Sequence, residues 1–169
     1  MSAYNSIYTA AKTVVFWDME DCEIPDGLNA GEVWQNIIKS LVNKGYHGSV
    51  EIKAYGESKD DLTSSEIKLK HFSAENGDGR VNQILVDLYF GAVDKCAPSN
   101  VMLIMGDISQ KDSIIEILRD MKSANYNVLL AQHQNVSEVL PTIASSLWLW
   151  TSLSAGEILS TKAEAQNIA

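Results

Sequence analysis

The sequence is poor in cysteine, with only Cys22 and Cys96 among its 169 residues. These two form no CxxC motif, and the three histidines are scattered, so the ligand spacing of a zinc site is missing. Because disulfides persist in oxidising compartments, we interpret both cysteines as small buried side chains of a protein in a reducing compartment. We therefore expect an intracellular protein, with the cytoplasm as the first expectation and an organelle as an open alternative.

Long apolar runs are also missing. No stretch approaches the roughly 20 apolar residues that a membrane-spanning helix needs. Residues 1–12 contain neither the apolar centre of a signal peptide nor the arginines of a typical transit peptide. We therefore expect no association with a membrane.

Basic side chains are scarce, because 13 Lys and Arg stand against 22 Asp and Glu and give a net charge of −9. Holding nucleic acid by bulk electrostatics takes many contacts between basic side chains and phosphates, so this composition argues against it. A local basic strip stays open, since several basic residues fall close together: Lys53, Lys59, Lys68, Lys70 and Arg80. A solvated face explains this group nearly as well.

Strand-like apolar segments alternate with amphipathic helical segments. Strands are predicted at residues 13–18, 49–55, 65–72, 100–107, 127–132 and 146–153, and helices at 30–44, 81–95, 112–125 and, despite Pro141, 136–145. Asn29 is the expected N-cap of the first helix, and Gly45 is its expected end. This order indicates an α/β fold with a mainly parallel central sheet of five or six strands and helices on both faces. We expect an N-terminal extension at 1–11, one domain at 12–156 and a tail at 157–169.

Acids follow two of the most apolar strands, at Asp18 and at Asp107. If these strands are neighbours, two carboxylates about 5 Å apart repel by about 3 kcal/mol at an effective dielectric constant of 20. A divalent cation with oxygen ligands, Mg²⁺ or Mn²⁺, would lower that cost, activate water and hold a phosphate oxygen. The alternative is that Asp18, Glu20 and Asp21 only cap turns and that Asp107 caps the next helix.

Three stretches of the chain carry a family resemblance. "VFWDMEDCEIP" is similar to an opening WD-x-E-N-C-x-x-P, "ILVDLYFGAVD" with "VMLIMGD" to a helix and an acid-ended strand, and "YNVLLAQ" with "SLWLWTSLSAG" to closing segments. Together they resemble the NYN domain of the limkain type (meiosis regulator and mRNA stability factor), a branch of the PIN-like nucleases, and its plant members in particular. The resemblance covers roughly residues 12–156. It implies a Rossmann-like sheet of order 3-2-1-4-5 and metal-dependent cleavage of single-stranded RNA.

The resemblance also implies a set of catalytic acids. Asp18 matches the first acid, Glu57 the acid at the end of the second strand, and Asp107 the last one. These three are the expected ligands of Mg²⁺ or Mn²⁺. Asp21 stands where the family carries asparagine and is a fourth candidate catalytic residue.

The chain departs from the family pattern at one further acid, which the family places near the start of the helix before the acid-ended strand. Val81 stands at that position. Asp87 is a poor substitute, because six residues along a helix rotate the side chain by about 240°, and Asp78 would have to reach inward from "NGDG". The family's GD-x-D-F motif is "GDISQKD" here, so Ser109 replaces its second acid.

Two functions follow as hypotheses. In the first, a metal-dependent endoribonuclease uses these acids, while Lys68, Lys70 and Arg80 hold the RNA backbone and Tyr55 stacks on a base. In the second, a degenerate domain of the same fold binds RNA or a protein partner without cleavage. A third class, phosphoryl chemistry on a small substrate, lacks its required partner residues in the chain.

Two tryptophans near the end of the domain bear on oligomeric state. Trp148 and Trp150 share one face of the strand predicted at 146–153. We expect a core contact or a homodimer contact from them, ahead of stacking on a base.

Overall fold

The computed structural model describes residues 4–57, 66–94, 98–109, 111–133 and 140–156. Its strands are β1 (Thr13–Asp18), β2 (Val50–Gly56), β3 (Ile67–His71), β4 (Asn100–Ile104), β5 (Asn127–Gln132) and β6 (Ser146–Leu149). Its helices are α1 (Tyr4–Thr9), α2 (Ala30–Asn43), α3 (Gly77–Asp94), α4 (Asp112–Ser123), α5 (Leu140–Ile143) and α6 (Trp150–Ala155). None of these helices is both long enough and apolar enough to cross a membrane.

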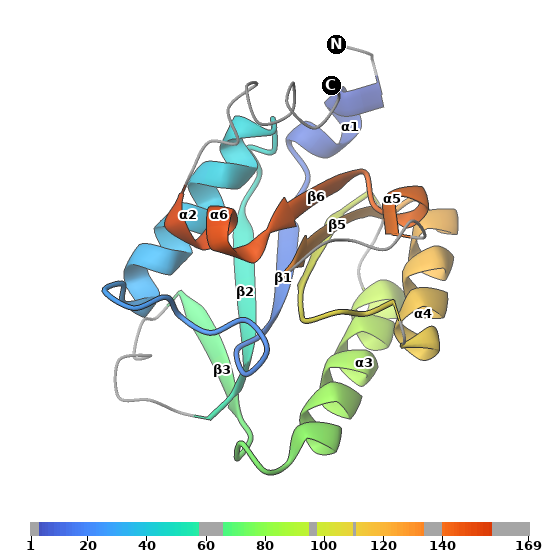
Figure 1. The fold of residues 1–169 in the computed structure, drawn as a ribbon. Helices are drawn as coiled ribbons and strands as arrows, with labels where there is room; N and C mark the ends of the chain where they lie inside the picture. Colours follow the sequence, from blue (N-terminus) through green and yellow to red (C-terminus); the bar gives the residue numbers. More distant parts are fainter. Residues whose placement is uncertain (1–3, 58–65, 95–97, 110, 134–139, 157–169) are drawn as a thin grey trace, which may run out of the picture.

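The described strands form one six-stranded sheet in the order β3-β2-β1-β4-β5-β6, and every neighbouring pair is parallel (Figure 1). The predicted α/β fold and the order 3-2-1-4-5 are therefore confirmed, and β6 extends the sheet beyond β5. Every residue of β1 is buried, because this strand lies between β2 and β4 and under helices on both faces. Its last residue, Asp18, therefore lies in the middle of the carboxyl edge of the sheet.

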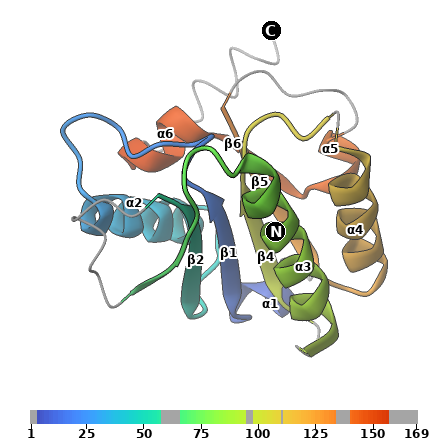
Figure 2. The same cartoon turned by 90° about the horizontal axis from the view of Figure 1, so that it is seen from below.

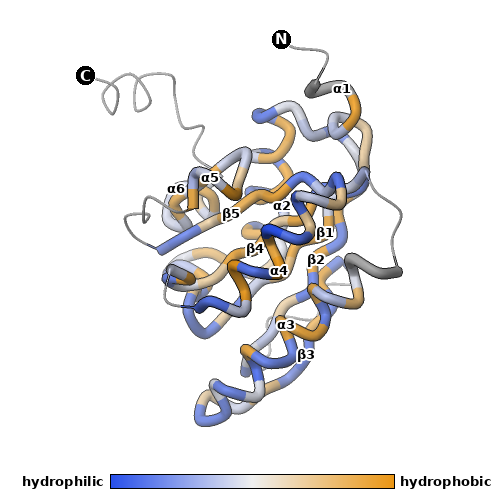
Figure 3. Tube along the Cα trace, turned by 90° about the vertical axis from the view of Figure 1, so that its right-hand side faces the viewer, coloured by the Kyte–Doolittle hydropathy of each residue, from blue (hydrophilic) through white to orange (hydrophobic). Residues whose placement is uncertain are grey.

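Helices cover the two faces of the sheet as separate layers (Figure 2). Alternate side chains of β1 enter different cores: Val15 and Trp17 pack with α2 and α6, whereas Val14 and Phe16 pack with α3 and α4. In the tube coloured by hydropathy, α4 alternates apolar and polar segments and β5 is mostly apolar (Figure 3). This is the pattern expected for amphipathic helices on a buried parallel sheet.

Helix α2 begins where the sequence predicts and ends one residue before the predicted limit. The Asn29 side chain accepts the backbone N–H of Glu32 at 2.9 Å, and its amide donates to the Glu32 carboxylate at 2.7 Å. This reciprocal arrangement satisfies one of the free N–H groups at the start of the helix. The helix ends at Asn43, and Gly45 follows with φ +96°, a conformation that glycine adopts without strain.

Three predicted boundaries are wrong by three residues or more. Helix α3 begins at Gly77 instead of residue 81, because the Asn76 side chain accepts the N–H of Gly79 and turns the glycine-rich segment into the first helical turn. Strand β4 ends at Ile104, so Asp107 lies in the following loop. The last predicted strand, 146–153, divides into β6 and the short helix α6, which begins at Trp150.

Trp150 therefore shares no strand with Trp148. Its ring packs on Trp17 with centroids 5.3 Å apart, and its Nε1–H donates to the backbone oxygen of Glu23 at 2.8 Å. The first contact belongs to the core, and the second fixes the loop after β1. Of the two predicted roles for this tryptophan, the core contact is confirmed. Of the helix predicted at 136–145, residues 140–143 are helical and 136–139 lie outside the described residues.

We expect Trp150→Ala to lower the free energy of unfolding by about 3–5 kcal/mol, because it removes a large buried ring from the core. Trp150→Phe retains a ring and loses mainly the hydrogen bond to Glu23, which costs about 1 kcal/mol. Urea denaturation of both variants measures the two effects. Equal losses for the two variants would contradict the core role of the ring.

Candidate active site at the carboxyl edge of the sheet

The loop after β1 is organised by Asp18. Its Oδ1 accepts the backbone N–H of Glu20 at 3.1 Å and of Asp21 at 3.3 Å, and its own backbone oxygen accepts the N–H of Cys22 at 3.0 Å. The Nε1–H of Trp17 then donates to the Cys22 oxygen at 2.8 Å. Of the two roles predicted for Asp18, the role of an acid that caps its own turn is therefore confirmed. Its carboxylate is fully buried (0% exposed).

A buried arginine accompanies this carboxylate. The Nε of Arg80 lies 2.8 Å from Asp18 Oδ1, and its Nη2 lies 3.8 Å from Asp21 Oδ1. Because α3 begins at Gly77, Arg80 occupies its first turn and shares the core-facing stripe with Ile84 and Leu88, four and eight residues on. The guanidinium is thereby directed inward, and the Arg80 side chain is only 8% exposed.

Burial, a neighbouring carboxylate and a neighbouring cation all shift the pKa of Asp18. Burial raises its pKa, the carboxylate of Asp21 raises it further, and Arg80 and the backbone N–H groups act against both, with a net upward shift. Asp18 Oδ2 is buried without a hydrogen-bond partner among the described residues. The Nε–H of Arg80 is close to Oδ1 but not aligned for a hydrogen bond, so the contact is an ion pair.

The other loop acids bind backbone groups. Glu20 Oε1 accepts the N–H of Glu57 at 2.9 Å, which ties the loop to the end of β2. Asp21 Oδ2 accepts the N–H of Gly106 at 3.3 Å, which ties the loop to the segment after β4. A Cβ at position 106 would lie 2.8 Å from Asp21 Oδ2, so this close approach requires glycine.

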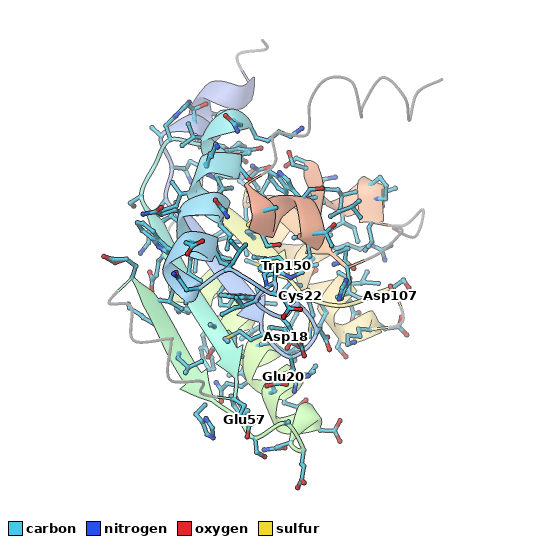
Figure 4. All side chains as sticks on the ribbon, turned by 60° about the vertical axis from the view of Figure 1, so that its left-hand side comes forward. Asp18, Glu20, Cys22, Glu57, Asp107 and Trp150 are labelled. Atoms are coloured by element: carbon cyan, nitrogen blue, oxygen red, sulfur yellow. The ribbon has the colours of Figure 1, made fainter. Side chains whose placement is uncertain are left out.

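Asp107 and Glu57, predicted as metal ligands beside Asp18, are both exposed. Asp107 Oδ1 accepts the backbone N–H of Ser109 at 2.9 Å. A hydrogen bond from the Ser109 side chain, then this backbone hydrogen bond and, to a smaller extent, the charge of Lys111 lower the pKa of Asp107. Figure 4 shows Asp107 to one side of the group formed by Asp18, Glu20 and Glu57. The expected meeting of Asp18 and Asp107 depended on a strand that reached residue 107, and β4 ends three residues earlier.

These residues, as arranged, do not fit a divalent metal ion. Mg²⁺ and Mn²⁺ take several oxygen ligands around one point. Among the side chains that the structure describes, no group of three His, Cys, Asp or Glu converges in that way. The cation beside Asp18 is instead the guanidinium of Arg80.

The predicted RNA-binding residues fall into two groups. Lys68 and Lys70 are exposed on β3. Tyr55 is fully buried and donates its hydroxyl hydrogen to Asp87 at 2.6 Å, so its ring cannot stack on a base in this arrangement. Arg80 is likewise withdrawn from the surface by its contact with Asp18.

Asp87 contacts Tyr55, Lys70 and Gln83. Burial by itself raises the pKa of Asp87, but hydrogen bonds from Lys70, Tyr55 and Gln83 outweigh this and lower it. The sequence reasoning missed the contact of Arg80 with Asp18. The available signal was the spacing of Arg80 from Ile84 and Leu88, which becomes visible once the helix starts at Gly77.

The parallel sheet of order β3-β2-β1-β4-β5-β6 and the acids at its carboxyl edge are consistent with a single domain of the PIN-like class. The chain matches the family described as the NYN domain over residues 12–147, and it belongs to that family. A comparison with curated proteins finds none that matches. Members of the NYN family are PIN-like nucleases, generally dependent on a divalent metal, and membership supports a role connected with RNA.

We expect Arg80→Ala to lower the free energy of unfolding by about 3–5 kcal/mol, because it leaves a buried carboxylate unpaired. The loss should be smaller for Arg80→Ala in an Asp18→Asn background, where no charge is left behind. Urea denaturation of the four proteins in this double-mutant cycle measures the coupling. Additive losses would contradict the ion pair.

The free energy of unfolding of the Arg80→Ala variant should also change with pH in a defined direction. Removing Arg80 removes an influence that lowers the Asp18 pKa, so the folded pKa rises further above the unfolded value of about 3.9. The folded variant then binds the proton more tightly than the unfolded chain. The stability that protonated Asp18 contributes to the variant is fully present below the unfolded pKa of this group. It is lost as the pH rises through the folded pKa. Denaturation at several pH values above about 4 checks this, with Asp18→Asn/Arg80→Ala as the control that lacks this titration.

Proposed function

We propose that this NYN domain acts as an RNA-binding domain that does not cleave RNA, because an arginine of the protein takes the part of the metal ion. The observation that carries this proposal is the contact of Arg80 with Asp18 at 2.8 Å, inside the carboxyl edge of the sheet. A divalent metal and a guanidinium both offset the charge of a buried carboxylate, but their chemistry differs.

A metal ion at such a site lowers the pKa of a bound water and polarises a phosphate oxygen. A guanidinium carries only donors, has no coordination site for water and stays protonated at any physiological pH. It can therefore stabilise the fold around Asp18 without generating a nucleophile. Val81, at the position where the family carries an acid, supports the same conclusion, since it offers no ligand atom.

Metal-dependent cleavage of single-stranded RNA is the second candidate. The unpartnered Oδ2 of Asp18 favours it, because that oxygen is a buried acceptor that a cation could use. In this candidate Arg80 would have to withdraw, and Asp18, Asp107 and Glu57 would hold Mg²⁺ or Mn²⁺, with Asp21 in support. The metal would supply an activated water and a clamp on the phosphate.

We propose three further assignments. The stretch "WDMEDCEIP" favours the limkain-type branch, and "YNVLLAQ" with "SLWLWTSLSAG" favours its plant members. The buried free thiol of Cys22 accords with an intracellular location, in the cytoplasm or an organelle. A homodimer or a protein partner is an alternative to RNA for the degenerate domain.

The test combines a cleavage assay with calorimetry on the full chain. We expect no cleavage of labelled single-stranded RNA in Mg²⁺ or Mn²⁺, and no heat of Mn²⁺ binding. The double variant Arg80→Ser/Val81→Asp removes the guanidinium and returns an acid, and it should gain measurable Mn²⁺ binding. Arg119→Ser, on the exposed side of α4, is the matched control for the loss of one arginine.

Cleavage by the unaltered protein that disappears in Asp18→Asn and in Asp107→Asn would sink the proposal in favour of the second candidate. Cleavage that survives both substitutions would point to a contaminating nuclease. Mn²⁺ binding by the unaltered protein would also contradict the proposal, whether or not RNA is cut.

A further inference from the structure

The carboxyl edge of the sheet is a poor surface for RNA when no metal is present. Two hollows open there, of about 230 and 470 Å³, and Glu20, Glu23 and Asp26 line both. Glu57 lines the first, and Asp21 lines the second. Among the described residues that line the two hollows there is no lysine or arginine. Phosphates brought to this edge would meet carboxylates of the same sign, so a metal-free domain must hold RNA elsewhere.

A second surface has the opposite charge. Lys53 on β2 lies beside Lys68 on β3, and Tyr55 lies beside Lys70 in the same register. All three lysines are on the face of the sheet that carries α3, because Lys70 pairs with Asp87 of α3 and Lys53 lies over the Phe16 ring at 5.5 Å. We call these three lysines, together with Phe90 of α3, the lysine edge.

The carboxylates that pair with Lys68 and Lys70 are less exposed than the two lysine side chains. Glu51 contacts Lys68 at 3.0 Å with its side chain 16% exposed, whereas that of Lys68 is 70% exposed. Asp87 contacts Lys70 at 2.8 Å, with exposures of 13% and 49%. Within the described residues no carboxylate pairs with Lys53. Positive charge is therefore presented to solvent, while the acids hold the lysine side chains in place from below.

An exposed aromatic ring borders these lysines. Phe90 is 54% exposed and lies three residues after Asp87, on the same flank of α3. Its neighbour Gly91 approaches Phe16, since a Cβ there would lie 3.7 Å from the Phe16 ring, and Lys53 lies over that ring. Phe90 consequently flanks the part of the lysine edge nearest Lys53. Lysines along a strand beside an exposed ring are the combination that binds single-stranded nucleic acid without reading its sequence.

We propose that single-stranded RNA binds along the lysine edge, with phosphates on Lys53, Lys68 and Lys70 and a base stacked on Phe90. This inference rests on the proposed function, because it names the surface that a non-cleaving domain uses. Strand β3 is the edge strand of the sheet, so the sheet adjoins RNA bound there on one side only. The opposing charge of the carboxyl edge keeps RNA from sliding toward Asp18.

The experiment measures binding of the full chain to a fluorescein-labelled oligouridylate by fluorescence anisotropy in EDTA, over a range of salt concentrations. Lys53→Gln/Lys68→Gln should raise Kd by about tenfold or more. It should also reduce the slope of log K against log salt by about 1.4, or about 0.7 for each lost phosphate contact on a single strand. Phe90→Ala should raise Kd by about fivefold or more and leave the slope unchanged, since stacking releases no counterions.

Two variants control for charge and for apolar surface. Lys39→Gln/Arg119→Gln removes the same two charges from exposed positions on α2 and α4, and Leu149→Ala removes an exposed apolar side chain. Both should bind as the unaltered protein does. Circular dichroism and thermal unfolding verify the fold of each variant, and Lys68→Gln alone alters one highly exposed side chain if the double variant unfolds.

The outcomes separate the two proposals. RNA binding that is equally sensitive to both pairs of charge substitutions, or insensitive to the lysine pair, overturns the lysine edge and leaves a non-cleaving RNA-binding domain intact. Cleavage of the oligonucleotide when Mn²⁺ replaces EDTA overturns the proposed function without touching the lysine edge. An unaltered protein that binds no RNA overturns both, and a protein partner then becomes the alternative.

Discussion

The contact between Arg80 and Asp18 is the interaction on which the carboxyl edge of this domain depends. Asp18 ends the central strand, where burial on both faces removes its carboxylate from water. A lone charge there costs several kcal/mol, so a cation must accompany it. Arg80 meets that need from the first turn of α3. Asp21 joins the same cation to the segment after β4 through Gly106.

A cation supplied by the protein divides the surface into two electrostatic regions. With a bound metal, the acids of the carboxyl edge would attract phosphate. With a buried guanidinium they remain a negative surface, because Arg80 faces Asp18 and not solvent. A group of positive charges lies instead on β2 and β3, where the partner acids of Lys68 and Lys70 are largely covered. A fold shared with nucleases can thus keep a connection with RNA while its use of RNA changes, since function depends on the site and not on the scaffold.

The sequence predicted best the parts of the fold that local physics determines. The predicted limits of strands 13–18 and 127–132 agree with the structure, because each strand is a short apolar run between two helical segments. Asn29 is predictable as a cap from its residue type and its place before the helix. Three features differed from what the residue pattern predicts. The glycines of "NGDG" suggested a break, but Asn76 makes them a helical start. The spacing of Trp148 and Trp150 imitated a strand, although Trp150 opens a helix. The limit of β4 placed Asp107 in a loop and away from Asp18.

If position 81 has lost an acid, as the family resemblance implies, that loss and the arginine at position 80 are physically linked. If Val81 replaces a ligand, a metal at this site is held by fewer oxygens and binds less tightly, which leaves Asp18 buried without compensation for more of the time. An arginine one residue earlier then stabilises the folded state whether or not metal is available. The reverse order is less favourable, because a guanidinium beside a complete set of acids would compete with the metal and weaken any catalysis before the fold gained from it. The adjacent pair is therefore best understood as one change in how Asp18 is neutralised, from an exchangeable ion to a permanent one.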